Sequence, residues 1–175
     1  MRSRLSPSAC SVTMTGMYQM EEAMSVDESV TQDLVKTLEN GHDGFQRAAE
    51  RLSSSNEPAL AAEFAKFGAQ RGQFATELAQ MAANYGDDVD KRSTVPGAIH
   101  RGWMAVKDML AGSEADGVLD AAAQGEDHAV EEYESALKAD ISEGLRAVIT
   151  RQYAEVKAAR DRVVGARDSA LAKNN

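Results

Sequence analysis

Apolar residues recur every three or four positions along four long stretches of the chain, which is the spacing of helices with one buried face. These stretches are residues 29–53, 58–85, 114–138 and 140–168. The β-branched residues do not form the alternating apolar and polar pattern that indicates strands. The chain is therefore predicted to be all-α, with four long helices.

Local signals mark the predicted helix starts. Ser29 with Gln32, and Asp140 with Glu143, match the capping box, in which two side chains satisfy main-chain N–H groups of the first turn. Pro58 fits the first turn of the second helix, because the N–H that proline lacks would have no helical partner there.

A shorter amphipathic stretch, residues 96–110, separates the second long helix from the third. A short extra helix in this position can serve as a crossover, so that the two long helices beside it run parallel instead of forming a hairpin. Its apolar side consists of Ile99, Trp103, Val106 and Leu110.

The N-terminal segment, residues 1–27, shows neither a helical stripe nor the apolar stretch of a secretory signal, and is predicted to be disordered or peripheral. One interpretation of this segment is that Met20 or Met24 is the natural start, and the rival interpretation is a short targeting arm that carries Arg2 and Arg4. A single domain is expected over residues 28–171, with a tail at 172–175, because a chain of 175 residues fills one core but not two.

Composition restricts the compartment and the partners. The 28 acidic and 19 basic residues give a net charge of −9, which works against binding to nucleic acid or anionic membranes. Cys10 is the single cysteine, and no stretch approaches the roughly 18 consecutive apolar residues of a membrane span. A soluble, cytoplasmic protein without nucleic-acid or membrane partners is expected.

Five segments carry a family resemblance, and in chain order they are GHDGFQRAAE, AQRGQFATEL, HRGW at residues 100–103, GEDHAVEEYESAL and RQYAEVKAARDRV. Over roughly residues 28–168 the chain resembles an uncharacterised family of bacterial ferritin-like four-helix proteins, defined only as a domain of unknown function. The resemblance implies a ferritin-like four-helix bundle without an assigned activity. The wider superfamily suggests iron and, by analogy alone, a role in stress physiology.

A dimetal site of the ferritin-like kind needs a Glu from each of two helices and Glu-x-x-His from each of the other two. The sequence places one such motif in the long helices, with Glu39 mostly on the solvent side and His42 at the flank of the apolar stripe. An iron-binding oxidoreductase or iron-handling protein is therefore the alternative interpretation. Its ligands would have to include Glu126 together with Glu39, His42, Glu77 or Glu155 after helix rotation.

Counting from the predicted turns places four inward-facing residues at about the same mid-bundle height: Gly41, Arg71, Glu126 and Gln152. An ionised Glu126 is too costly to bury without a partner. We expect the guanidinium of Arg71 to pair with it in place of a metal ion, with help from Gln152 and from Tyr133 or Tyr153. The opposing hypothesis is that Arg71 extends to solvent and Glu126 pairs elsewhere.

Nearby glycines indicate close helix approach or room for a bulky neighbour, at Gly41, Gly44, Gly68, Gly72 and Gly125. A third interpretation is a small-ligand binder that uses a cavity left by these glycines, which a pocket lined by Trp103 and Tyr133 would favour. His100 beside Trp103 on the short helix is a further pocket candidate. A tryptophan in such a position more often caps the core, while the histidine bonds to the main chain.

The fourth long helix is the basic element of an acidic protein, with Arg146, Arg151, Lys157, Arg160, Arg162 and Arg167. These residues predict a solvated face or a homo-oligomer contact with the acidic third helix of another copy. The sequence contains no nucleophile triad, phosphate-binding glycine loop or paired cysteine ligands. We therefore expect a structural or interaction module without enzymatic activity, cofactor or metal, and with an unknown protein partner.

Overall fold

The computed structural model describes residues 10–84 and 115–173, and these residues form helices and short turns. The helices are α1 (Cys10–Ser54), α2 (Pro58–Asn84), α4 (Ala115–Lys138) and α5 (Glu143–Lys173). The prediction of an all-α chain is confirmed for this part of the protein, which contains no strand. The predicted short helix at residues 96–110 lies outside the described residues.

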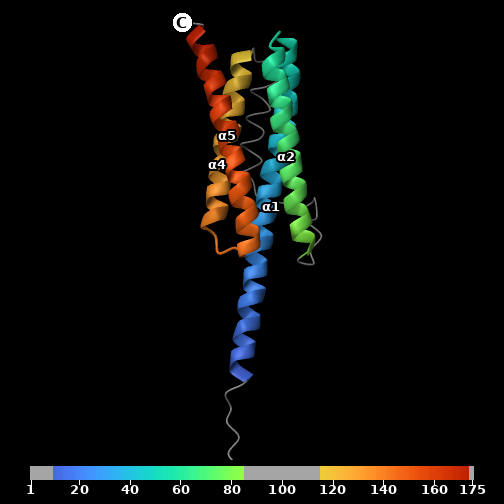
Figure 1. Cartoon of the computed structure of the whole chain (residues 1–175), viewed down its shortest axis with the longest axis vertical. Helices are drawn as coiled ribbons and strands as arrows, with labels where there is room; N and C mark the ends of the chain where they lie inside the picture. The colour runs from blue at the N-terminus through green and yellow to red at the C-terminus, as the bar shows by residue number, and fades with distance from the viewer. Residues whose placement is uncertain (1–9, 85–114, 174–175) are drawn as a thin grey trace, which may run out of the picture.

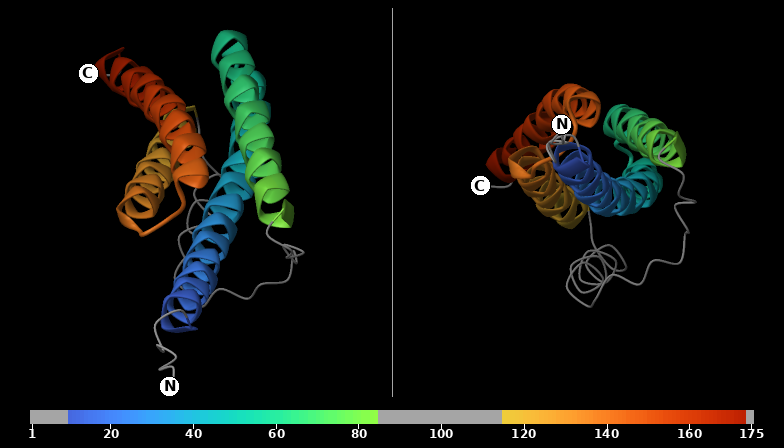
Figure 2. Two further views of the ribbon diagram at one scale, coloured as in Figure 1. Left: turned by 60° about the horizontal axis from the view of Figure 1, so that its bottom comes forward. Right: turned by 90° about the horizontal axis from the view of Figure 1, so that it is seen from below.

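The four helices lie side by side with their axes roughly aligned (Figure 1). Seen end-on, α1 has α2 on one side and α4 on the other, and α5 packs along α4 (Figure 2). Both α2 and α4 begin at the same end of the bundle (Figure 1). They therefore run parallel.

The start of α1 differs from the prediction. The helix begins at Cys10, and its first turns project past the ends of the other helices (Figure 1). Ser29 lies inside this helix, and Gln32 donates to Glu28 Oε1, at 2.9 Å, instead of closing a capping box. The prediction was wrong because Met, Glu and Ala before Ser29 favour the helical state, and a capping residue does not stop a helix that has already formed.

The start of α5 is fixed by a residue that the predicted domain left out. Asp27 of α1 is buried, and its Oδ1 accepts a hydrogen bond from Ser142 N at 2.8 Å. Ser142 Oγ in turn accepts from Leu145 N at 3.4 Å, which makes Ser142 the N-cap. The predicted capping box of Asp140 and Glu143 is therefore wrong.

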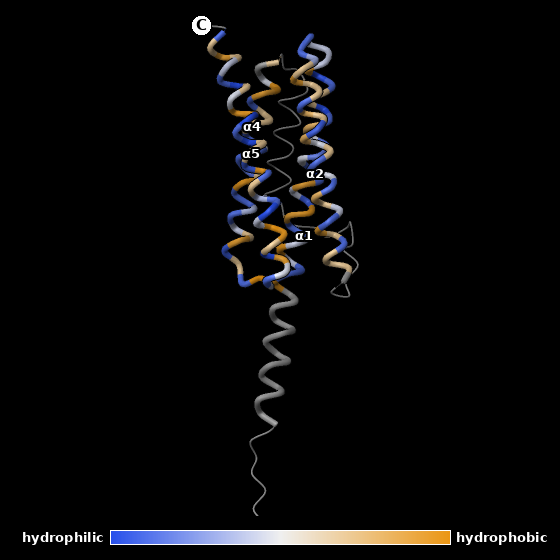
Figure 3. Tube along the Cα trace, in the orientation of Figure 1, coloured by the Kyte–Doolittle hydropathy of each residue, from blue (hydrophilic) through white to orange (hydrophobic). Residues whose placement is uncertain are grey.

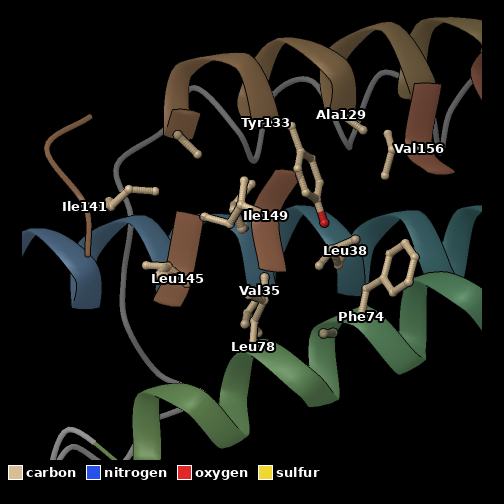
Figure 4. Close-up of a cluster of buried hydrophobic side chains, with 13 residues drawn as sticks. Val35, Leu38, Phe74, Leu78, Ala129, Tyr133, Ile141, Leu145, Ile149 and Val156 are labelled. Atoms are coloured by element: carbon tan, nitrogen blue, oxygen red, sulfur yellow. The ribbon is translucent and has the colours of Figure 1, made fainter. Parts of the chain in front are cut away.

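The core consists of two apolar clusters, one in each half of the bundle. The cluster nearer the α4–α5 turn includes Leu38, Leu78 and Ile149 and is shown in Figure 4. The other includes Leu52 and Phe64. Apolar residues recur among polar ones along the coloured parts of the helices (Figure 3), and none of the described helices has an apolar stretch long enough to span a bilayer.

Two glycines allow α1 and α2 to approach closely. A Cβ at Gly68 would lie 3.3 Å from both His42 O and Phe45 Cβ, and a Cβ at Gly72 would lie 3.2 Å from His42 Nδ1. At Gly125, by contrast, an added Cβ would meet nothing within 4 Å. The prediction of close helix approach therefore holds for Gly68 and Gly72 but not for Gly125.

Gly68→Ala and Gly125→Ala should change stability in opposite directions. Each gains about 1 kcal/mol of helix propensity. At Gly68 the neighbouring atoms belong to the frame of α1, so the helices must separate, at a cost of about 1–3 kcal/mol. Urea denaturation should show Gly68→Ala below the wild type and Gly125→Ala above it. An equal gain in both variants would contradict the close α1–α2 contact.

Candidate functional site

A buried ion pair joins two helices across the centre of the bundle. Arg71 comes from α2 and Glu126 from α4, and their side chains are 1% and 3% exposed. Arg71 Nη2 donates to Glu126 Oε2 at 2.5 Å. The structure therefore brings together the two residues that the sequence pattern paired, and Arg71 does not extend to solvent.

The pair lies at the boundary between the two apolar clusters. On α1 the clusters meet between Leu38 and Phe45, on either side of Gly41. A Cβ at Gly41 would lie 3.5 Å from Arg71 Cγ, so the stem of the arginine passes over this glycine. The guanidinium carbon is 5.8 Å from the centre of the Phe45 ring. Apolar and aromatic groups thus surround the charges and exclude water from them.

Gln70 is the additional partner of Arg71, and the sequence pattern did not single it out. Its Oε1 accepts from Arg71 Nη1 at 2.8 Å, and its Nε2 donates to Glu155 Oε2 at 2.8 Å. Gln70 lies on the partly exposed edge of α2, where glutamine is common and carries no signal of its own. Arg71 Nε is buried without an acceptor among the described residues.

Burial dominates the electrostatics of Glu126. It raises the pKa of this carboxyl above its ordinary value, while the charge and the hydrogen bond of Arg71 oppose the shift and the neighbouring Asp127 adds to it. The attraction of Arg71 therefore does not fully offset the loss of water. This balance is the one expected of buried ion pairs, which contribute little net stability.

Gln152 and Tyr133 form a second buried network, and in the described part of the chain they make no hydrogen bond to the ion pair. Tyr133 OH donates to Gln152 Oε1 at 2.7 Å, and Gln152 Nε2 donates to Glu77 Oε2 at 2.8 Å. Figure 4 shows the Tyr133 hydroxyl directed towards Leu38 and Phe74. Burial raises the pKa of Tyr133, so its hydroxyl remains a donor.

The prediction that Gln152, with Tyr133 or Tyr153, completes the Arg71–Glu126 pair was therefore wrong. On α5 the two clusters meet between Val156 and Val163, so Gln152 lies at least one turn away from that boundary. Counting from the turn misplaced it because α5 begins at Glu143 and not at Asp140. Tyr153 stacks on Tyr133 and donates to Glu134 at 2.8 Å, near the surface.

The other candidate metal ligands have different neighbours and do not converge on Glu126. Glu39 is exposed. His42 Nδ1 donates to Gly68 O at 2.7 Å, and its Nε2 lies 3.0 Å from Gln46 Nε2. The main-chain oxygen can only accept, so the Nδ1–H tautomer is present and the imidazole is held against α2.

Glu77 and Glu155 lie between α2 and α5, where both contact Arg151. Burial raises the pKa of Glu77, but hydrogen bonds from Gln152 and Arg151 and the charge of Arg151 outweigh it, so the net pKa lies below the ordinary value. A fixed cation next to Glu126, and carboxylates committed to other donors, do not fit the dimetal donor set. Among the described residues no three carboxylate, histidine or cysteine side chains form a metal-binding group.

Two further predictions concern the pocket and the basic helix. His100 and Trp103 lie outside the described residues, so the structure shows nothing of the pocket assigned to them. Arg146 donates to the main-chain oxygens of Leu137 and Ala139, whereas the other arginines of α5 contact acidic residues of the same chain. These pairs join Arg151 to Glu77, Arg160 to Asp127 and Arg162 to Glu63.

Comparison with known proteins finds one family. A family model described as a domain of unknown function (DUF2383) matches residues 28–139. The match includes both Arg71 and Glu126 and ends before α5. No curated protein matches the chain.

Removing one member of the ion pair should destabilise the protein far more than removing both. Arg71→Ala leaves Glu126 buried without its cation and should cost about 3–5 kcal/mol. Arg71→Met combined with Glu126→Leu fills the same space with apolar groups and should lie close to the wild type. Thermal melts of the three proteins test this, and equal melting of the two variants would contradict the pair.

The raised pKa of Glu126 predicts a distinctive pH dependence. Between the ordinary value of 4.5 and the higher value in the folded protein, the native state binds more protons than the unfolded state. Stability from this group therefore falls as pH rises through that window and is constant above it.

Glu126→Gln lacks the titrating group, so it isolates the effect. Urea denaturation is measured from about pH 4 to pH 8, a range over which an ordinary glutamate becomes fully ionised. The free energy of unfolding of the wild type, minus that of Glu126→Gln, should decrease as pH rises. An increasing difference would mean that pairing with Arg71 lowers the pKa instead.

Proposed function

The chain belongs to the family of the domain of unknown function DUF2383, and from this premise we propose that it is a ferritin-like bundle acting as a structural or interaction module without catalysis. In this proposal the guanidinium of Arg71 takes the electrostatic place that a metal ion holds in ferritin-like metalloproteins. By superfamily analogy alone, we place this module in stress physiology.

One observation carries the proposal: the 2.5 Å contact between Arg71 and Glu126, with both side chains buried at the boundary of the two clusters. A guanidinium keeps its charge under all physiological conditions and has no lone pair to offer a metal. It also repels a second cation beside Glu126. The layer thus holds two helices in register and has no open coordination position for chemistry.

The helix directions support the ferritin-like assignment. In Figure 1, α1 with α2 and α4 with α5 form two antiparallel pairs, and α2 and α4 run parallel. Ferritin-like folds use one long crossover connection, and their metal ligands project inward from facing helices. Arg71 and Glu126 project inward from α2 and α4 in the same way.

Metal analysis after expression with added iron tests the proposal. The wild type should carry iron well below one atom per chain, at the same level as Glu126→Gln. Near-stoichiometric iron in the wild type that is lost in Glu126→Gln would overturn it and favour the dimetal oxidoreductase or iron-handling alternative. A far-ultraviolet circular dichroism spectrum of each protein checks that both are folded.

A further inference from the structure

One side of the bundle is built differently from the others. The main chains of α1 and α2, of α1 and α4, and of α4 and α5 pack closely along their lengths, whereas α2 and α5 approach closely at few positions. Figure 2 shows the helices in an arc with α2 and α5 at its two ends. Long side chains therefore have to bridge this α2–α5 seam.

Three exposed polar pairs cross the seam, and we call them the ladder. Arg162 donates to Glu63 at 2.7 Å, Gln70 donates to Glu155 at 2.8 Å, and Arg151 donates to Glu77 at 2.5 Å. The members on α2 are seven residues apart, which is about two helical turns. The ladder thus follows one edge of α2, with partners on α5 in reverse order, as expected for antiparallel helices.

The ladder is directly connected to the buried polar groups. Gln70 bonds to Glu155 in the seam and to Arg71 in the core. Glu77 accepts from Arg151 in the seam and from Gln152 in the core. Two of the three ladder pairs therefore close the space in front of buried polar side chains, and separating them would expose those side chains to water.

The energetics make this seam the weakest side of the bundle. The side chains of Arg151 and Arg162 are 49% and 69% exposed. Ion pairs at such exposure contribute about 0–1 kcal/mol each. Salt also screens exposed pairs, whereas the apolar contact of Phe45 with Gly68 between α1 and α2 does not depend on ionic strength.

We propose that the α2–α5 seam is where the bundle opens, with the α1–α4 contact as the hinge, and that opening admits water and small ions to the Arg71–Glu126 pair. The unpaired Nε–H of Arg71 supports this, because it is a buried donor that opening would hydrate. This inference goes beyond the proposed function and does not depend on it, since no metal takes part.

Two cysteine probes test the opening in the full chain with Cys10→Ser. Ala159 follows Gln152 by seven residues on the edge of α5 that faces α2, and it is 3% exposed. Ala75 follows Gly68 by seven residues on the side of α2 that faces α1, and it is 6% exposed. The two alanines have the same size and similar burial. Ala159 lies beside the α2–α5 seam, whereas Ala75 lies beside the α1–α2 contact.

The rate of modification by a thiol reagent such as dithionitrobenzoate is measured at low and high salt. Raising sodium chloride from about 0.05 M to about 1 M shortens the screening length severalfold. It should accelerate reaction of the Ala159→Cys thiol about tenfold, as expected from weakening the two exposed ion pairs of the ladder. The Ala75→Cys thiol should change less than about twofold, because apolar contacts protect it. Equal salt dependence at the two positions would overturn the proposal.

A charge exchange links the opening to the ladder. Arg162→Glu faces Glu63 with a like charge and should accelerate reaction of the Ala159→Cys thiol at low salt. Combining it with Glu63→Arg restores an opposite pair and should return the rate towards that of the parent. Failure of either result would contradict the ladder as the closing element. If Ala159→Cys does not fold, Val148→Cys replaces it, because Val148 lies one turn before Gln152 on the same edge.

Discussion

A charged side chain in the dry centre of a protein needs a partner of opposite charge, and this constraint organises the middle of the bundle. Glu126 of α4 and Arg71 of α2 satisfy it by reaching each other across the diagonal. Their contact lies between the two apolar clusters of the core. Buried ion pairs of this kind add little net stability, although removing one partner is costly.

The close packing of α1 on α2 and the wider spacing of α2 and α5 follow from the size of the side chains on two edges of α2. Gly68 and Gly72 remove side chains from one edge of α2, so α1 can approach it. Glu63, Gln70 and Glu77 place long polar groups on another edge, so α5 stays farther away. One helix therefore carries a tight apolar contact and a polar contact that responds to salt.

Helical periodicity was sufficient to predict the fold class and the end of α4 at Lys138. It also predicted that Arg71 and Glu126 point into the core, because burial follows the 3.6-residue repeat. It did not predict what completes each hydrogen-bond network. Gln70 and Asp27 acquire their roles from residues 85 and 115 positions away in the chain, and no local pattern contains that information. Gln152 was assigned to the wrong layer because α5 starts a few residues later than predicted. That shift changes the height of every α5 residue along the bundle.

The most direct test of a side-chain cation in this layer is a crystal structure of protein grown with added iron, with anomalous data collected at the iron absorption edge. The account predicts no anomalous peak beside Glu126 and a guanidinium of Arg71 within hydrogen-bonding distance of its carboxylate. An iron peak bound to Glu126, or an Arg71 side chain extended into solvent, would contradict it.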